Sequence, residues 1–286
     1  MEIIKPLKGM LVFQTDFGYK ETSVSAMYGV AKCVERSLEL IDSTHELPPF
    51  DIWSASYRLF QSIRFWPKGT IFVSVVDPGV GTARKACVAY TGDGHYVVTP
   101  DNGSLTHVAR DSGIVAVREI DETVNRLHGF GTDETSVFHG RDLFGYCAAK
   151  LAAGKITFEE VGPAYNPKDV VTFDIPEASV TDGKAEGIIE IDDTNFGNLF
   201  TNIPTKQMLS HGFGYGETVH VRISHGITAF EEDIPFEKTF GDVKVGEPVL
   251  YNNELMKASL AVCRGSFVEK YHVGFGPDWR VELVGK

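Results

Sequence analysis

The stretch Thr70-Ile71-Phe72-Val73-Ser74-Val75-Val76-Asp77-Pro78-Gly79-Val80-Gly81-Thr82-Ala83-Arg84 begins as an apolar run and ends as a polar loop. The run 70–76 is typical of a buried strand, and it stops at a carboxylate, a proline and two glycines. Ligands of open α/β sheets bind at the carboxyl ends of the strands, so Asp77 is a candidate site residue. The alternative is an ordinary strand exit, in which Asp77 bonds to nearby backbone amides.

Short apolar runs alternate with longer helical patterns on both sides of this stretch. Strands are predicted at 10–15, 38–42 and 70–76, and helices at 23–36, 51–66 and 134–153. Asp51 is the expected N-cap of the second helix, and 86–91 with 95–99 read as a hairpin. The alternation predicts an N-terminal α/β domain with a mostly parallel sheet.

The pattern changes near Gly162-Pro163-Ala164-Tyr165-Asn166-Pro167, where two prolines and a glycine indicate a connector. Helical periodicity nearly vanishes beyond it, and strands are predicted at 185–191, 199–203, 218–224, 248–251 and 259–262. We therefore expect an α/β domain at 1–165 and a β-barrel-like domain, barrel or sandwich, at 166–286.

Composition narrows the class of protein. A formal net charge of −12 over 286 residues argues against a nucleic-acid groove. No apolar run approaches the roughly 20 residues that cross a bilayer, and the N-terminus lacks the layout of a secretory signal. The 4 cysteines are far apart, without a Cys-x-x-Cys pair, so neither a zinc site nor a disulfide framework is expected. These features predict a cytoplasmic protein.

The loop after the first strand carries two acids, Asp16 and Glu21. A dinucleotide-binding protein places a glycine-rich phosphate loop here, and the two carboxylates would instead repel phosphate. They suit a ribose diol or an ammonium group. The alternative is that Glu21 or Ser23 caps the helix that follows.

Three further loops combine polar groups. They are Pro100-Asp101-Asn102-Gly103, Phe138-His139-Gly140-Arg141-Asp142 and the turn from Asp193 to Asn198. His139 has a side chain suited to proton transfer, although a lone histidine is more often structural. The alternative for Arg141 and Asp142 is a local ion pair, and that for the third loop is an Asx-rich turn. No second His/Asp pair at ligand spacing accompanies His139, so no metal site is expected.

Five motifs together resemble the S-adenosylmethionine (SAM) hydroxide adenosyltransferase family, hydrolases related to the fluorinase and chlorinase. They are Thr-Asp-Phe-Gly at 15–18, Val-Asp-Pro-Gly-Val-Gly at 76–81, Pro-Asp-Asn-Gly at 100–103, Phe-His-Gly-Arg-Asp at 138–142 and Phe-Gly-Asn-Leu-Phe-Thr-Asn-Ile at 196–203. The resemblance implies an α/β domain followed by a β-barrel, assembled as a homotrimer. It also implies that SAM, a substrate that needs no cofactor, lies between one subunit's N-terminal domain and its neighbour's C-terminal domain.

The resemblance also implies roles for particular residues. Carried over by motif, the substrate-binding residues are Asp16 for the ribose hydroxyls, Glu21 and Asp193 for the methionine ammonium, Ser23 and Asn198 for the amino-acid end, and Phe50, where the halogenases have a tryptophan.

The choice of nucleophile depends on Asp77, Arg84 and His139. The halogenases carry an aromatic residue in place of Asp77, whereas the hydroxide-using members carry this Asp-Arg-His set. A carboxylate opposes a halide, while it can orient water and accept its proton. The expected reaction is attack of water on the ribose C5′ of SAM, giving adenosine and L-methionine. Either Asp77 or His139 accepts the proton.

The C-terminal clamp departs from the family. Asn252-Asn253-Glu254 stands where the family reads Asn-Ser-x-Gly, and Cys263 replaces an asparagine just before Arg264. Asn253 and Arg264 are the expected contacts of the substrate here, while Glu254 is unfavourable beside a carboxylate. Two alternatives stay open. One is a halide-dependent adenosyl transferase that forms 5′-chloro-5′-deoxyadenosine, with Gly140 leaving room for the anion, and the other is a catalytically weak adenosine- or SAM-binding protein.

Overall fold

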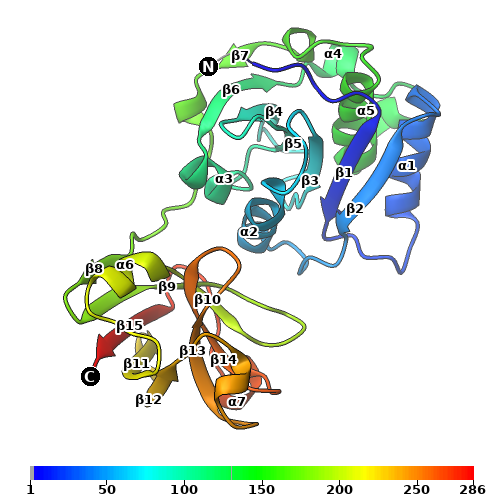
Figure 1. The fold of residues 1–286 in the computed structure, drawn as a ribbon. Helices are drawn as coiled ribbons and strands as arrows, with labels where there is room; N and C mark the ends of the chain where they lie inside the picture. Colours follow the sequence, from blue (N-terminus) through cyan, green and yellow to red (C-terminus); the bar gives the residue numbers. More distant parts are fainter. Residues whose placement is uncertain (1–2, 130) are drawn as a thin grey trace. The chain divides into compact units, whose positions relative to one another are not determined.

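The computed structural model describes residues 3–129 and 131–286. The chain divides into two compact units, an N-terminal unit that ends at Phe173 and a C-terminal unit, Asp174–Lys286. The division falls after the expected boundary at residue 165, because the chain from Ala164 to Phe173 still bonds to the N-terminal unit. Figure 1 labels the elements of both units.

The N-terminal unit is an α/β sandwich around a seven-stranded sheet formed by described residues. Its elements are β1 (Met10–Thr15), α1 (Ser23–Val34), β2 (Glu39–Thr44), α2 (Ile52–Ile63), β3 (Ile71–Val75), β4 (Ala86–Thr91), β5 (Tyr96–Pro100), α3 (Thr106–Asp111), β6 (Ile114–Glu119), α4 (Glu122–Asn125), α5 (Tyr146–Ala152) and β7 (Ala164–Tyr165). The strand order is β2-β1-β3-β5-β4-β6-β7. Strands β2, β1, β3 and β5 run parallel, and β4 is antiparallel to both β5 and β6.

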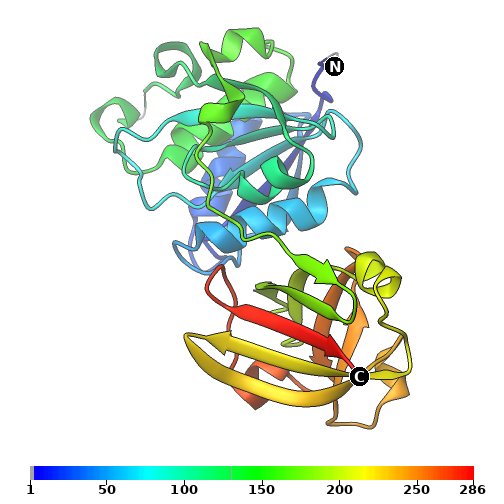
Figure 2. The same cartoon turned by 90° about the vertical axis from the view of Figure 1, so that its left-hand side faces the viewer.

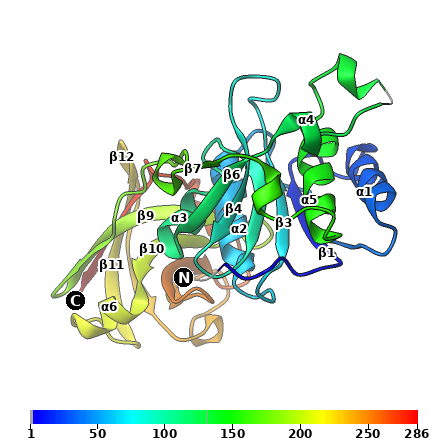
Figure 3. The ribbon, with the colours of Figure 1, turned by 90° about the horizontal axis from the view of Figure 1, so that it is seen from above.

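The helices cover both faces of this sheet. Figure 3 shows α1 and α5 on one face and α2 and α3 on the other. The expected N-cap is confirmed, since Asp51 Oδ1 accepts a hydrogen bond from the Ser54 amide at 3.0 Å. Every residue of β3 is buried, as the apolar run predicted. The predicted hairpin of 86–91 and 95–99 is confirmed as the antiparallel pair β4–β5.

The predicted helix at 134–153 is wrong in its first part. Thr135 is extended, and the helix begins as a π-helical turn, Gly140–Gly145, that continues into α5. The Thr135 carbonyl accepts a hydrogen bond from Arg126 Nη2 at 2.7 Å, which holds this backbone away from a helical ladder. His139 consequently lies at the start of the helix.

The C-terminal unit is a closed β-barrel. Its elements are β8 (Ser179–Thr181), β9 (Lys184–Asp192), β10 (Leu199–Pro204), α6 (Thr205–Ser210), β11 (Glu217–His225), β12 (Ile227–Phe236), β13 (Pro248–Asn252), β14 (Lys257–Val262), α7 (Phe267–Tyr271) and β15 (Arg280–Gly285). The strand order is β10-β14-β13-β12-β11-β15-β9-β8, and the pairing of β9 with β10 closes the barrel. Figure 2 shows the long strands curving around their common interior.

Pattern reasoning located five of these strands and missed β8, β12 and β15. In β12 most residues are exposed, and Glu231-Glu232-Asp233 interrupts the alternation that marks a strand.

Among the described residues, no helix is both long and apolar enough to span a membrane.

Candidate active site

The structure brings Asp77, Arg84 and His139 together beside the carboxyl end of β3 in the N-terminal sheet. Arg84 Nε donates to Asp77 Oδ1 and Oδ2 at 3.0 and 3.1 Å, and Arg84 Nη2 also bonds to Asp77 Oδ2. Arg84 Nη2 lies 2.8 Å from His139 Nδ1. The side chains of Arg84 and Asp77 are only 10% and 6% exposed, so this ion pair is shielded from bulk water.

The hydrogen bonds define the tautomer of His139. A guanidinium has donors only, so His139 Nδ1 must accept from Arg84, and the ring proton resides on Nε2. Burial, followed by the charge of Arg84, lowers the pKa of His139. His139 is therefore a neutral imidazole whose acceptor nitrogen is already used.

Arg126, which the sequence reasoning missed, faces the other side of the imidazole. Arg126 Nη1 lies 3.5 Å from His139 Nε2, and Glu122 accepts from the same Nη1 at 2.7 Å. Protonated His139 would face two guanidinium groups, which again favours the neutral ring. The only local signal for Arg126 was its i,i+4 spacing from Glu122, and this spacing ordinarily indicates a surface pair.

A cavity of about 440 Å³ adjoins this set within the N-terminal unit. Five predicted site residues line it: Asp16, Ser23, Phe50, Asp77 and His139. The remaining lining comes from Phe17, Pro49, Val75, Val80, Val137, Phe138 and Gly140. Carboxylates and an imidazole thus face a largely apolar chamber, an arrangement that strengthens electrostatic interactions with a bound cation.

Asp16 follows β1 and is held by the chain beside Phe50. The Phe50 amide donates to Asp16 Oδ2 at 2.8 Å, and burial raises the pKa of Asp16. Phe50 has a φ of +67° and is 72% exposed, so its ring stands open to a ligand rather than within the core. Asp16 keeps acceptor capacity for a ligand hydroxyl.

A buried histidine supports the loop that carries Asp16. His45 Nδ1 lies 2.7 Å from Thr15 Oγ1, and the Gly18 amide donates to the His45 carbonyl at 2.7 Å. The side chain and backbone of one residue therefore hold both ends of the 15–18 loop.

Glu21 differs from the other predicted residues of this unit. Its side chain is exposed, does not line the cavity, and accepts a hydrogen bond from the Ser23 amide at 3.2 Å. The hydroxyl and amide of Ser23 lower the pKa of Glu21. The N-cap of α1 is Thr22, so Glu21 bonds the first helical amide from the residue before the cap, and neither Glu21 nor Ser23 is the capping residue.

A second cavity, of about 920 Å³, lies in the C-terminal unit and is lined by Asp193, Asn198, Asn253 and Arg264. Asp193 and Asn198 come from the turn between β9 and β10, and the Asp193 amide donates to the Asn198 carbonyl at 2.7 Å. Gly197 is essential to the shape of the cavity, because a Cβ there would lie 1.9 Å from Ser266 Oγ. The turn that carries Arg264 can therefore pack against the 193–198 turn.

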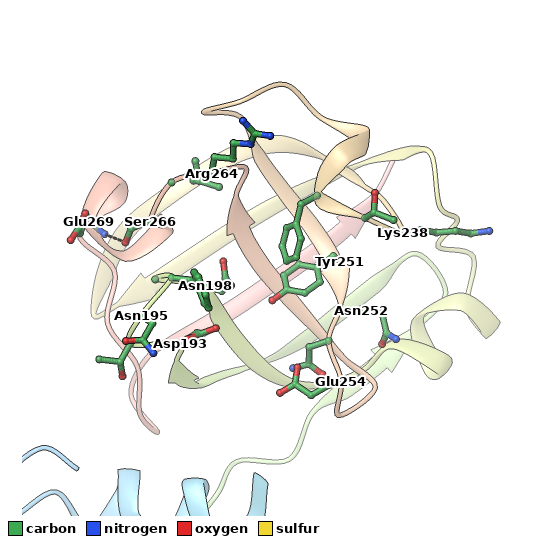
Figure 4. A pocket seen from close by; sticks show the side chains of 18 residues that line it. Asp193, Asn195, Asn198, Lys238, Tyr251, Asn252, Glu254, Arg264, Ser266 and Glu269 are labelled. Carbon is green, nitrogen blue, oxygen red and sulfur yellow. Dashed lines mark hydrogen bonds between the residues drawn. The ribbon is translucent and has the colours of Figure 1, made fainter. Parts of the chain in front are cut away.

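Acidic groups gather on one side of this cavity. In Figure 4 the side chains of Asp193, Asn198, Tyr251 and Glu254 face a common space, whereas Lys238 extends away from it. Burial raises the pKa of Tyr251, and the charges of Glu254 and Asp193 raise it further. Asp193 can pair with a ligand cation here, whereas Glu254 opposes a ligand carboxylate.

The side chain of Asn253 is largely committed to its own turn. Its Oδ1 accepts from the amides of Leu255 and Lys257 at 2.9 and 3.0 Å, and its Nδ2 donates to Ser259 Oγ at 3.0 Å. The residue is 3% exposed. One N–H remains for a ligand, so Asn253 chiefly shapes the cavity wall.

No group of three or more His, Cys, Asp or Glu suited to holding a metal ion occurs in the described ranges 3–129 and 131–286. The alternative given for Arg141 and Asp142, a local ion pair, is confirmed, with Arg141 Nε 2.5 Å from Asp142 Oδ1.

The fold and the sites define a class of protein in which an α/β unit carries a shielded acid–guanidinium–imidazole set and a β-barrel unit carries a second polar cavity. The chain belongs to the SAM hydroxide adenosyltransferase family, whose N-terminal domain matches residues 11–162 and whose C-terminal domain matches residues 186–280. The expected family is thus confirmed.

Relatives of two activities are similar to this chain over nearly its whole length. A protein of Salinispora tropica named (R)-S-adenosyl-L-methionine hydrolase is 32% identical over 270 residues, 94% of this chain and 96% of the relative. A fluorinase of Actinopolyspora mzabensis is 27% identical over 296 residues, 95% of this chain and 96% of the relative. The crystal structure of an uncharacterized conserved protein from Thermotoga maritima aligns with a TM-score of 0.87 at 34% identity, covering 96% of this chain and all of that one.

Proposed function

We propose that this chain hydrolyses SAM by attack of water on the ribose C5′ and releases adenosine and L-methionine. The observation that carries the proposal is the shielded contact of Asp77, Arg84 and His139 at the cavity that also holds Asp16. The curated relative at 32% identity is named a SAM hydrolase, which supports the same reaction.

The reaction is an in-line displacement. The oxygen of water forms a bond to C5′ while the C5′–S bond breaks, and the electron pair stays on the sulfur of methionine. The leaving group is neutral, so no general acid is required. As the C5′–S bond breaks, positive charge passes from the sulfur to the attacking water, and a carboxylate beside that water stabilises the charge that develops there, which lowers the barrier.

Asp77 is the better candidate for proton acceptor. His139 Nδ1 already accepts from Arg84, whereas a carboxylate has about four lone-pair positions and keeps some free beside Arg84. The protons of the attacking water become strongly acidic as its oxygen bonds to C5′, so a weakly basic carboxylate is sufficient to accept one of them. Arg84 and His139 then hold Asp77 and the water in line.

The substrate contacts follow from the two cavities. Asp16 accepts the ribose hydroxyls, Phe50 covers the sugar, and Ser23 contacts the amino-acid end. Asp193 pairs with the methionine ammonium, while Asn198 and Arg264 meet the remaining polar groups. The carboxylate of Glu21 lies outside the cavity of its own unit, so we assign it no direct contact with the substrate. Its negative charge instead attracts the ammonium from a distance.

We propose that these groups meet across a homotrimer, with the N-terminal unit of one subunit and the C-terminal unit of its neighbour sharing each SAM. Each cavity carries only part of the predicted set, which supports a shared site. A cytoplasmic location is proposed because the four cysteines are free thiols, as is usual in a reducing compartment.

The direct test incubates the protein with SAM in water labelled with heavy oxygen and follows the products by chromatography and mass spectrometry. Adenosine that carries the label at its 5′-hydroxyl, together with unlabelled methionine, is the expected result. Label in the amino-acid fragment, or no adenosine, contradicts the proposal. A denatured sample reports the spontaneous background.

Complementation tests the shared site. Asp77→Asn and Asp193→Asn, each weakly active alone, regain part of the activity when the two are mixed under subunit exchange, because some mixed sites carry both native halves. Absence of any regain, with trimers shown by light scattering, means that each subunit builds its own site.

A further inference from the structure

The turn at residues 100–103 was singled out by sequence, yet none of its residues lines the cavity of the N-terminal unit. The position of this turn in the sheet indicates a structural role instead. β5 lies between β3 and β4, parallel to the first and antiparallel to the second. The end of β5 therefore emerges between the end of β3 and the start of β4, the two points that the loop carrying Asp77 and Arg84 connects.

Two hydrogen bonds join this turn to both ends of that loop. Asn102 Nδ2 donates to the Val76 carbonyl at 3.0 Å, directly before Asp77. The Asp101 amide donates to the Lys85 carbonyl at 2.9 Å, directly after Arg84. Asn102 Oδ1 accepts from the Ser104 amide at 3.3 Å, which orients the donor end of the amide toward Val76.

Apart from the Asp77–Arg84 pair itself, the hydrogen bonds within the loop do not connect its two ends. Its internal backbone bonds are local turns, Val80 to Asp77 at 3.2 Å and Thr82 to Gly79 at 3.1 Å. Residues 81–83 are exposed. The distance between the backbones of Asp77 and Arg84 is consequently governed by the strand ends and by the turn between them.

The same turn also holds the last residues of the N-terminal unit. The Asp101 carboxylate accepts from the Tyr165 hydroxyl and from the Val171 amide, both at 2.8 Å. Gly103 has a φ of +110°, and a Cβ there would lie 2.7 Å from the Phe173 ring. The side chain of Asp101 and the close approach at Gly103 thus hold residues 165–173, whereas the Asp101 amide and the Asn102 side chain hold the loop.

We infer that the turn 100–103 is the positioning element of the Asp77–Arg84 pair, with Asn102 as a positioning residue for the attack of water. The inference rests on the proposed function. A small displacement of the pair spoils its alignment with C5′ without changing how SAM is held, so the effect falls on kcat rather than on KM.

The test compares Asn102→Ala and Asn102→Asp with wild type. Asn102→Asp keeps the size and the Oδ1 acceptor and replaces the donor with an oxygen that opposes the Val76 carbonyl, so it supplies folded protein if the alanine variant is unstable. We expect kcat for adenosine formation to fall roughly tenfold or more in both, with KM within about twofold.

Asn202→Ala is the matched control. Asn202 Nδ2 donates to the Pro176 carbonyl at 2.7 Å and its Oδ1 accepts from the Ile188 amide at 2.9 Å, a bonding pattern like that of Asn102 but within the C-terminal unit. It does not line the barrel cavity. Its loss lowers the melting temperature and leaves kcat unchanged.

Titration of His139 by NMR gives a readout besides activity. Displacement of Arg84 removes a cation from Nδ1, so the pKa of His139 rises in the Asn102 variants and stays at the wild-type value in Asn202→Ala. Folded Asn102 variants with wild-type kcat and an unshifted His139 overturn the inference. Wild type that forms no adenosine overturns the proposed function instead, while the His139 titration still decides the positioning role.

Discussion

Arg84 Nη2 bonds to both Asp77 Oδ2 and His139 Nδ1, although His139 lies 55 residues further along the chain. One guanidinium therefore orders an acid and an imidazole at once. Arg84 also lies over the Phe144 ring, with 5.1 Å between Cζ and the ring centroid, so its position is restrained on a third side. Loss of this one side chain frees both partners.

Arg84→Lys and Asp77→Asn are expected to lower adenosine formation by roughly two to three orders of magnitude, because each removes a group aligned with the attacking oxygen. Lysine keeps the charge but cannot form the forked contact with Asp77 and His139. Product chromatography measures the rate. Arg64→Lys, which alters the surface pair of Arg64 with Asp111 at 2.7 Å, is the control and keeps the wild-type rate.

Chloride is expected to yield no 5′-chloro-5′-deoxyadenosine, even in large excess over SAM, because the Asp77 carboxylate repels an anion at the position of attack. Chromatography against an authentic standard checks this. Formation of the chlorinated nucleoside at a rate comparable to that of adenosine would falsify the assignment of water as the preferred nucleophile.

Charge removal in the barrel cavity is expected to act in opposite directions at two acids. Glu254→Gln lowers KM for SAM by roughly three- to tenfold, because a like charge beside the substrate carboxylate is removed. Asp193→Asn raises KM, because the ammonium loses its partner. Steady-state kinetics at low salt measures both, and Glu232→Gln on the exposed face of β12 is the control.

Stability is expected to decrease on acidification through buried histidines. Burial, followed by the charge of Arg110, lowers the pKa of His107 to about 3. Because the unfolded value is near 6.5, the unfolded chain binds more protons between these values, so stability is complete above about pH 6.5 and is lost as pH falls toward 3. His45, His95 and His139 shift in the same direction.

Urea unfolding at pH 7 and near pH 4.5 measures this effect. The contribution of His107 to the free energy of unfolding falls by roughly 2–3 kcal/mol between the two conditions. His107→Gln therefore loses less stability on acidification than wild type does. Exposed His225 is the control, since His225→Gln keeps the wild-type slope.

The contact of Asp77 with Arg84 was expected from the family resemblance, and the topology explains it. Asp77 leaves β3 and Arg84 enters β4, two strand ends with only β5 between them, and the loop that joins them brings a carboxylate and a guanidinium together. His139 needed the family resemblance, because nothing in its own segment indicates that it crosses to Arg84. The five strands predicted for the second half were correct because their apolar residues line a barrel interior.

Other features lay outside what local pattern can show. Arg126 looks like half of a surface pair, and only the path of residues 132–139 carries the imidazole to it. Asn102 looks like a turn residue, since a bond to Val76 depends on the order of strands rather than on spacing. Asn253 was expected to meet the substrate, whereas its turn uses most of its hydrogen-bonding groups.

The barrel of the C-terminal unit closes because β9 pairs with β15 along its first half and with β10 along its second. Its backbone is satisfied strand to strand, independently of the turns at 193–198, 252–256 and 262–266 that form the cavity rim. The 193–198 and 262–266 turns pack on each other at Gly197 and Ser266, so an exchange between homologues has to move these two turns together. Engineering of selectivity toward other sulfonium compounds should therefore begin with these three segments.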